Sequence, residues 1–212
     1  DVSISGIDVD SATVALLPYS ADLVSTYDGR EMTLSTSSNR AVLSYQEGTT
    51  ASIITYLPLG DYEFVPAHSG LVSLHDKNRH RLILIDPSNR EQPILVNEEA
   101  SLWAWHPSND VLLFSSGYDL KRYVRSIHES QTLTRLSTPI EQLDWFPLGN
   151  AAIYRTQGTI TALNLDGVTI LSQSALWTDL AGSFWLSPDG ATLSSLVETQ
   201  EGWQWWTRKL QN

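Results

Sequence analysis

The chain has 212 residues, of which 42% are hydrophobic, and this is enough for one well-packed domain or a compact array of repeats. Its formal net charge of −11 argues against nucleic acid or an anionic membrane surface as a partner, because both would repel it. The chain has no cysteine, which excludes disulfides and thiolate metal sites, and no apolar run approaches the roughly 20 residues of a membrane helix.

The first part of the chain predicts one isolated strand. Residues 1–10 alternate apolar and polar residues, and we expect them to form an N-terminal arm. Residues 11–18 contain the apolar run from Thr13 to Leu17, which ends at Pro18 and therefore predicts a short strand. Because the sequence opens at Asp1 rather than at Met, we expect a processed or trimmed part of a larger protein.

From residue 21 onward, one unit of about 40 residues recurs five times, and such a fixed period is the signature of a repeat architecture. Trp105, Trp145 and Trp185 are spaced 40 residues apart, and Phe64 lies 41 residues before Trp105. Val24 lies 40 residues before Phe64. The units span approximately residues 21–58, 61–97, 101–137, 141–173 and 181–210.

Each unit consists of short strands separated by turn residues such as Asp76-Lys77-Asn78 and Ser37-Ser38-Asn39. The first four units supply four strands each, and the third strand of the third unit is predicted at Arg122–His128. The fifth unit supplies only three, of which the last is Trp203–Lys209. No helix of useful length is predicted, so the fold class is all-β.

The strand at residues 11–18 is the missing fourth strand of the last unit. A ring of blades leaves no sheet edge unprotected if the first strand completes the last blade. The sequence therefore predicts a five-bladed β-propeller of four-stranded blades, a single domain over residues 1–212 that is closed by its N-terminal strand. The alternative is that the chain is one part of a larger propeller.

The stretch Trp185-Leu186-Ser187-Pro188-Asp189-Gly190 resembles the turn that ends the inner strand of a blade in TolB-type, or WD-repeat-like, β-propellers. The runs that end at Asp86 and Asp166 resemble the exit of the third strand in those blades. The resemblance extends over all five units, and the full turn motif occurs in the fifth. It implies blade architecture and, from the habit of that family, an extracytoplasmic location in the periplasm, at the cell surface or outside the cell.

Paired carboxylates are the catalytic candidates. Inner strands line the channel of a propeller, and carboxylates near their starts crowd its mouth; these are Asp22, Asp61, Glu63, Glu141 and Asp144. A glycosidase needs two carboxyl groups about 5 to 9.5 Å apart, one as acid and one as nucleophile or base. The short loops between strands offer little room for a sugar pocket. The alternative interpretation is that these acids are solvated or bond neighbouring backbone amides.

The sequence contains no motif typical of a nucleophilic, phosphate-binding or metal site. There is no Gly-x-Ser-x-Gly elbow, no phosphate-binding glycine loop and no His-x-x-x-His pattern on a helix, so we expect no cofactor and no metal. His75 and His80 could meet across a hairpin, but surface histidines are the simpler interpretation.

Tryptophan is over-represented, with 8 residues. Those at the repeat position, Trp105, Trp145 and Trp185, are expected to pack between blades. On the last strand, Trp203 and Trp205 point to one face and Trp206 to the other. If Trp203 and Trp205 stay exposed, they offer a platform for a sugar ring or for an apolar anchor of a partner; otherwise they belong to the core.

The sequence favours a non-enzymatic binding or scaffold module that engages a protein or glycan partner, as a monomeric domain of a larger envelope or secreted protein. The alternative is a small glycosidase-like hydrolase that uses Asp61 or Glu63 with Asp144. A hydrolase would lose activity when either acid is changed to its amide, whereas a binding module would tolerate the change.

Overall fold

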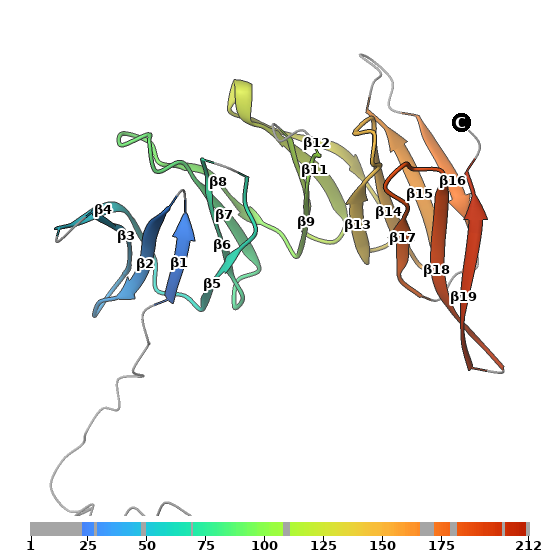
Figure 1. Cartoon of the computed structure of the whole chain (residues 1–212), viewed down its shortest axis with the longest axis horizontal. Helices are drawn as coiled ribbons and strands as arrows, with labels where there is room; N and C mark the ends of the chain where they lie inside the picture. Colours follow the sequence, from blue (N-terminus) through green and yellow to red (C-terminus); the bar gives the residue numbers. More distant parts are fainter. Residues whose placement is uncertain are drawn as a thin grey trace, which may run out of the picture.

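The computed structural model describes residues 23–27, 29–47, 50–68, 70–107, 111–165, 172–178, 182–200 and 202–210. These residues form five antiparallel sheets, which we call blades 1 to 5. The blades follow one another in sequence order along an open arc, with blade 1 at one end and blade 5 at the other (Figure 1). The described part of the chain contains no helix long and apolar enough to cross a membrane.

The strands of the first three blades run in sequence order across each sheet. Blade 1 consists of β1 (Leu23–Tyr27), β2 (Arg30–Thr36), β3 (Ala41–Glu47) and β4 (Thr50–Leu57). Blade 2 consists of β5 (Tyr62–Val65), β6 (Val72–Asp76), β7 (Arg81–Ile85) and β8 (Ile94–Glu99). Blade 3 consists of β9 (Leu102–Trp105), β10 (Val111–Ser115), β11 (Asp119–Val124), the short 3₁₀ turn η1 (Arg125–Ile127) and β12 (Glu129–Arg135).

The last two blades differ in strand number. Blade 4 consists of β13 (Gln142–Trp145), β14 (Ala151–Thr156), β15 (Thr159–Asn164) and β16 (Gln173–Trp177). Blade 5 has three described strands, β17 (Phe184–Leu186), β18 (Thr192–Thr199) and β19 (Gly202–Lys209). In the four complete blades, the register shifts by a β-bulge between the third strand and the outer strand. This repeated irregularity shows that the blades share one construction.

The core consists of apolar clusters between neighbouring blades. Along β7, Ile83 and Ile85 pack toward blade 1, whereas Leu82 and Leu84 pack toward blade 3. Both faces of such a strand are buried, so its sequence is a continuous apolar run. Two further clusters join blade 3 to blade 4 and blade 4 to blade 5. The first strands contact each other between blades 1 and 2, where β1 meets β5, and between blades 3 and 4, where β9 meets β13.

The all-β class and the five antiparallel blades are confirmed. Closure of the ring is not confirmed, because no apolar cluster among the described residues joins blade 1 to blade 5. The two blades lie at opposite ends of the arc (Figure 1). The predicted closing strand at residues 11–18 lies outside the described residues, so closure by that strand stays a prediction.

Candidate binding surface

The four described carboxylates lie in two pairs, Asp61 and Glu63 on blade 2 and Glu141 and Asp144 on blade 4, and several have local partners. Asp61 pairs with Lys77 at 3.2 Å, and Glu63 pairs with Nδ1 of His75 at 3.2 Å, both within blade 2. Glu141 pairs with Arg155 at 2.9 Å within blade 4. Each of these contacts is between residues on or beside adjacent strands, so it is a cross-strand pair. Asp22 lies outside the described residues.

Asp144 is the carboxylate whose environment changes its acidity. It lies on the inner strand β13, where its Oδ1 accepts a hydrogen bond of 2.8 Å from the backbone N–H of Trp145. Although the residue as a whole is exposed, partial burial of the carboxyl raises its pKa above the ordinary value of 3.8. Blade 3 lies between blade 4 and the acids Asp61 and Glu63 of blade 2.

Three of the five histidines, His68, His75 and His106, form aromatic contacts between blades. The ring of His106 in blade 3 meets Trp145 of blade 4 edge-on at 4.6 Å, and its Nε2 lies 2.9 Å from the carbonyl oxygen of Gly149. His75 packs against Trp103 of blade 3 at 4.9 Å. The described residues contain no group of three or more His, Asp or Glu side chains placed to hold a metal ion.

A cleft of about 450 Å³ lies between blades 1 and 2, a size in the range of small-molecule sites. Its walls include Ser25, Thr26, Met32, Phe64 and His68. Among the described residues, its lining includes none of the predicted acids Asp61, Glu63, Glu141 and Asp144, and neither Trp203 nor Trp205. The cleft is therefore separate from these predicted residues.

Three tryptophans gather on the uncovered face of blade 5. Trp185 lies opposite Ser194, Trp205 opposite Leu196 and Trp203 opposite Glu198. Residues that lie opposite each other in an antiparallel pair point to the same face of the sheet. The alternate positions, including Phe184, Leu193 and Val197, pack against blade 4, so the three tryptophans point away from it. We call Trp185, Trp203 and Trp205 the tryptophan face.

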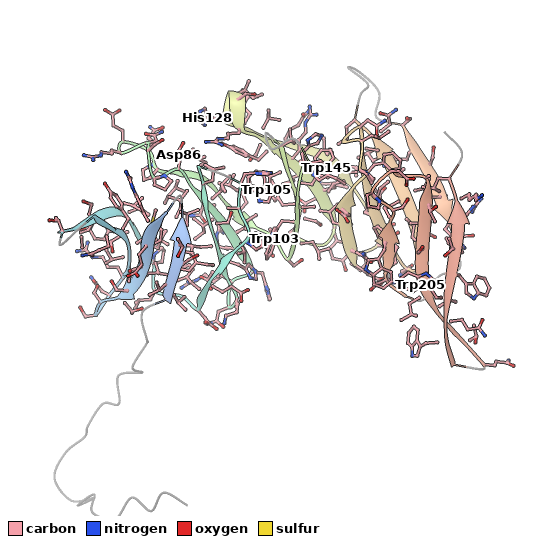
Figure 2. All side chains as sticks on the ribbon, viewed as in Figure 1. Asp86, Trp103, Trp105, His128, Trp145 and Trp205 are labelled. Atoms are coloured by element: carbon pink, nitrogen blue, oxygen red, sulfur yellow. The ribbon has the colours of Figure 1, made fainter. Side chains whose placement is uncertain are left out.

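The tryptophan face is open to solvent. Trp185 is 46% exposed, Trp203 58% and Trp205 57%. The rings of Trp185 and Trp205 lie 4.9 Å apart at an angle of 32°, so the two already pack on each other. Trp205 lies on the terminal blade, whereas Trp103, Trp105 and Trp145 lie within the arc (Figure 2). The predicted orientations of Trp203, Trp205 and Trp206 are confirmed, because Trp206 lies opposite the buried Ser195.

The prediction that Trp185 packs between blades is wrong, and a one-residue slip is the reason. Equivalent backbone hydrogen bonds run from His106 to Val111, from Phe146 to Ala151 and from Ser187 to Thr192. The preceding residues, Trp105, Trp145 and Leu186, are therefore equivalent. Leu186 packs toward blade 4, as Trp145 packs toward blade 3. Trp185 is one position earlier, and a shift of one residue turns a side chain to the other face of a sheet.

The other end of the arc has a different surface. On the uncovered face of blade 1, Val24, Thr33, Ser44 and Ile53 follow one another across the four strands. A second row contains Ser35, Val42 and Tyr56. We call these two rows the first-blade face. Its hydroxyl groups and β-branched side chains contrast with the aromatic rings of the tryptophan face.

Comparison with known proteins shows the fold. No protein-family model matches the sequence, and no curated protein matches it. Among solved structures, the chain is similar to the β-propeller domain of Myceliophteria thermophila Cps50 (Swd1), with 8% identity and a TM-score of 0.54 over 73% of this chain and 57% of that chain. It is similar to a chain of the mitotic checkpoint complex, with 15% identity and a TM-score of 0.53 over 89% of this chain and 61% of that one.

TolB from Acinetobacter baumannii also matches, with 14% identity and a TM-score of 0.49 over 80% of this chain and 46% of that chain. The chain thus spans 46% to 61% of the length of these solved chains. At such identities the likeness concerns the fold alone. The β-propeller fold that the blade motif indicated is confirmed at that level.

Proposed function

We propose that the chain is a non-enzymatic, protein-binding scaffold whose docking surface is the tryptophan face. The observation that carries this proposal is the gathering of three half-exposed tryptophans on one uncovered sheet face. Tryptophan is enriched among the residues that dominate binding energy at protein interfaces, because a large rigid ring buries much apolar area at a small entropic cost. Clustered apolar surface of this kind marks interaction sites.

The covered faces of the other blades support this assignment. The corresponding face of blade 1 presents Met32, Leu34 and Leu43, and that of blade 4 presents Ile153 and Ile160; both are covered by the next blade. Blade 5 has tryptophans there instead of aliphatic side chains, and Ser194 and Thr207 lie among them. An aromatic surface with hydroxyl groups beside it suits a separate partner better than permanent burial.

The chemistry of the partner follows from the surface and from the net charge. We expect an apolar anchor that fits against Trp205, and a partner that is neutral or basic, because the chain carries a net charge of −11. We further propose that the module belongs to a larger envelope or secreted protein. Its extracytoplasmic location, its monomeric state and the closing strand at residues 11–18 remain sequence-based predictions.

The hydrolase with Asp61 or Glu63 and Asp144 remains the alternative proposal. The raised pKa of Asp144 is the property that a general acid requires. The ion pairs of Asp61 with Lys77 and of Glu63 with His75 favour a structural role for those two acids. For this reason we place the binding module first.

The test immobilises three forms of the chain and compares which proteins each form binds from an extract of the cells that produce it. The informative variant is Trp203→Ser combined with Trp205→Ser, and the matched control is Ile53→Ser combined with Tyr56→Ser at the other end of the arc, where 54% and 47% of these residues are exposed. We expect one protein to bind the wild type and the control, and to bind the tryptophan variant at least about tenfold more weakly.

Equal binding of that protein to all three forms would show that the tryptophan face is not the docking surface. A parallel glycan-binding assay covers the other partner class: tryptophan-dependent binding of a glycan, without a bound protein, would change the proposal to a lectin. Hydrolysis of a glycan that is lost in Asp144→Asn would establish the hydrolase instead.

A further inference from the structure

Aromatic rings from two adjacent blades meet at the two junctions that follow the cleft between blades 1 and 2. Between blades 2 and 3, the ring of His68 meets Trp105 edge-on at 4.9 Å, and Nε1 of Trp105 donates a hydrogen bond of 3.2 Å to the carbonyl oxygen of Pro66. Between blades 3 and 4, His106 meets Trp145 in the same way at 4.6 Å. At both junctions a histidine of one blade thus covers a tryptophan of the next.

Blade 1 has a serine where blade 3 has its covering histidine. Val24 and Trp105 share one position of the repeat. The residues that follow them, Ser25 and His106, therefore correspond to each other. Ser25 lies opposite Met32, which packs in the apolar cluster between blades 1 and 2, so Ser25 points to blade 2 as His106 points to blade 4. A serine side chain fills much less space than an imidazole ring, and the cleft of about 450 Å³ lies beside it.

The walls of the cleft suit an uncharged aromatic molecule. The described residues that line it include no Asp, Glu, Lys or Arg, so a charged ligand would lose its hydration without gaining an ionic partner. Met32 and Val72 are 1% and 4% exposed, and Phe64 adds an aromatic ring. Ser25 and Thr26 of β1 also line the cleft. Apolar walls with a few polar groups are typical of small-molecule sites.

His68 indicates which polar group the ligand should carry. This residue lines the cleft, and its Nε2 lies 3.4 Å from the carbonyl oxygen of His106. A carbonyl oxygen can only accept a hydrogen bond, so Nε2 carries the hydrogen atom. In an uncharged imidazole ring the other nitrogen, Nδ1, is then an acceptor. The edge-on contact with Trp105 fixes the ring, and its acceptor matches a ligand that carries an N–H or O–H group.

We propose that the cleft binds a small, uncharged aromatic molecule with one hydrogen-bond donor on its ring, of the indole or phenol class. The ring packs against Phe64 in the space beside Ser25, and its donor bonds to Nδ1 of His68. The inference goes beyond the proposed function, because none of the described residues that line the cleft belongs to the tryptophan face. Blades 1 and 2 lie at the end of the arc away from blade 5 (Figure 1).

The experiment titrates indole against the whole chain and follows binding by the transfer of NMR saturation from the protein to the ligand. We expect saturable binding with a dissociation constant of about 1 mM or lower, which is reasonable for a compact ligand of this size. Benzothiophene has the same fused-ring shape but lacks the N–H group. It should bind about three- to tenfold more weakly, because one hydrogen bond is lost.

Ser25→Phe is the informative variant, because it places a ring where blade 3 has His106. It should weaken indole binding at least about tenfold by filling the cleft, and it should raise the melting temperature because it adds apolar contacts. Ser35→Phe is the matched control: it makes the same change on the neighbouring strand β2, but on the first-blade face, and it should leave indole binding unchanged.

Phe64→Leu tests the site without filling it. This change keeps an apolar side chain but removes the ring, and it should weaken indole binding about three- to tenfold. The combined change of Trp203→Ser and Trp205→Ser should leave indole binding unaltered, because both tryptophans lie on the uncovered face of blade 5. Its result distinguishes the cleft from stacking of indole on an exposed tryptophan.

The inference would be overturned by a wild type that shows no saturable binding of indole, or by equal binding to the wild type and to Ser25→Phe. Binding that is lost in the tryptophan variant and kept in Ser25→Phe would also overturn it, by assigning indole to the tryptophan face. Binding that appears only after removal of residues 1–19 would assign the cleft to the chain's own N-terminal segment. None of these results would affect the protein-binding test of the proposed function.

Discussion

The interface between blades 3 and 4 and the uncovered face of blade 5 use the same residue type in opposite ways. Trp145 is 5% exposed, and its Nε1 donates a hydrogen bond of 3.0 Å to the carbonyl oxygen of Ala104 in the preceding blade. Trp185, 40 residues later, is 46% exposed and stacks on Trp205 of its own blade. A repeat period thus assigns a tryptophan to a strand, but the register of that strand decides whether the side chain is buried between blades or exposed.

The largest expected effect is a difference in the free energy of unfolding between alanine variants of these two tryptophans. Trp145→Ala should lower the free energy of unfolding by about 3–5 kcal/mol, because it leaves a cavity between two blades and removes a buried hydrogen bond. Trp185→Ala should lower the free energy of unfolding by only about 1 kcal/mol, because the half-exposed ring loses mainly its contact with Trp205. Urea unfolding of both variants measures the difference. Similar losses in the two variants would show that blade 5 is covered in solution.

The next largest effect on stability is expected in the turn between β13 and β14 of blade 4, which contacts blade 3. Gly149 has φ +78, and a Cβ there would lie 2.1 Å from Nε2 of His106. Gly149→Ala should therefore cost about 2–3 kcal/mol, from left-handed strain together with displacement of the His106 ring.

Gly29→Ala is the matched control for this change. Gly29 has φ +72, but no atom lies within 4 Å of its Cβ position. We expect a loss of only about 1 kcal/mol from strain alone. Equal melting temperatures for the two variants would contradict the steric contribution of His106.

A smaller effect depends on pH and tests the ion pairs inside the arc. Burial raises the pKa of Asp119, but the hydrogen bond from Ser116 and the charge of Lys121, 3.7 Å away, outweigh it, so the pKa lies below its ordinary value of 3.8. The folded state thus prefers the carboxylate. The resulting stability is complete above the unfolded-state pKa and is lost as the pH falls through the folded-state pKa.

Asp119→Asn should accordingly lower the free energy of unfolding by about 1 kcal/mol at pH 7. The difference from the wild type should shrink below about pH 4, where the wild-type carboxyl begins to be protonated. Urea unfolding at pH 7 and pH 3 measures it, with the exposed Glu91→Gln as the control. A difference that stays constant between the two pH values would exclude ionisation as the cause.

The smallest expected effect concerns Asp144. Burial raises its pKa, so ionisation costs more in the folded state than in the unfolded state, and stability falls as the pH rises through the unfolded-state and folded-state values. Asp144→Asn should increase stability at pH 7 by a few tenths of a kcal/mol, a gain limited by solvent screening. The variant should keep tryptophan-dependent binding. Loss of binding or of a hydrolytic activity would give Asp144 a functional role.

The sequence predicted the blade architecture because strand signals are local. Continuous apolar runs such as Leu82 to Ile85 and turn clusters such as Asp76 to Asn78 determine where strands begin and end. The third strand of blade 3 was harder to place. It was predicted at Arg122–His128, but β11 spans Asp119–Val124, and Arg125–Ile127 form a 3₁₀ turn that ends at His128 with φ 54. A left-handed histidine gives no signal comparable to glycine.

The sequence by itself determined the all-β class, the five blades and the three strands that the fifth unit supplies. It also determined the opposite orientations of Trp205 and Trp206, because a strand alternates its side chains with a period of two. Only the tertiary structure decided that Trp185 is exposed, that Glu63 pairs with His75 and that the tryptophan face lies at the end of an open arc. Those outcomes depend on how one blade meets the next, and contacts between surfaces distant in sequence leave no periodic pattern in the chain.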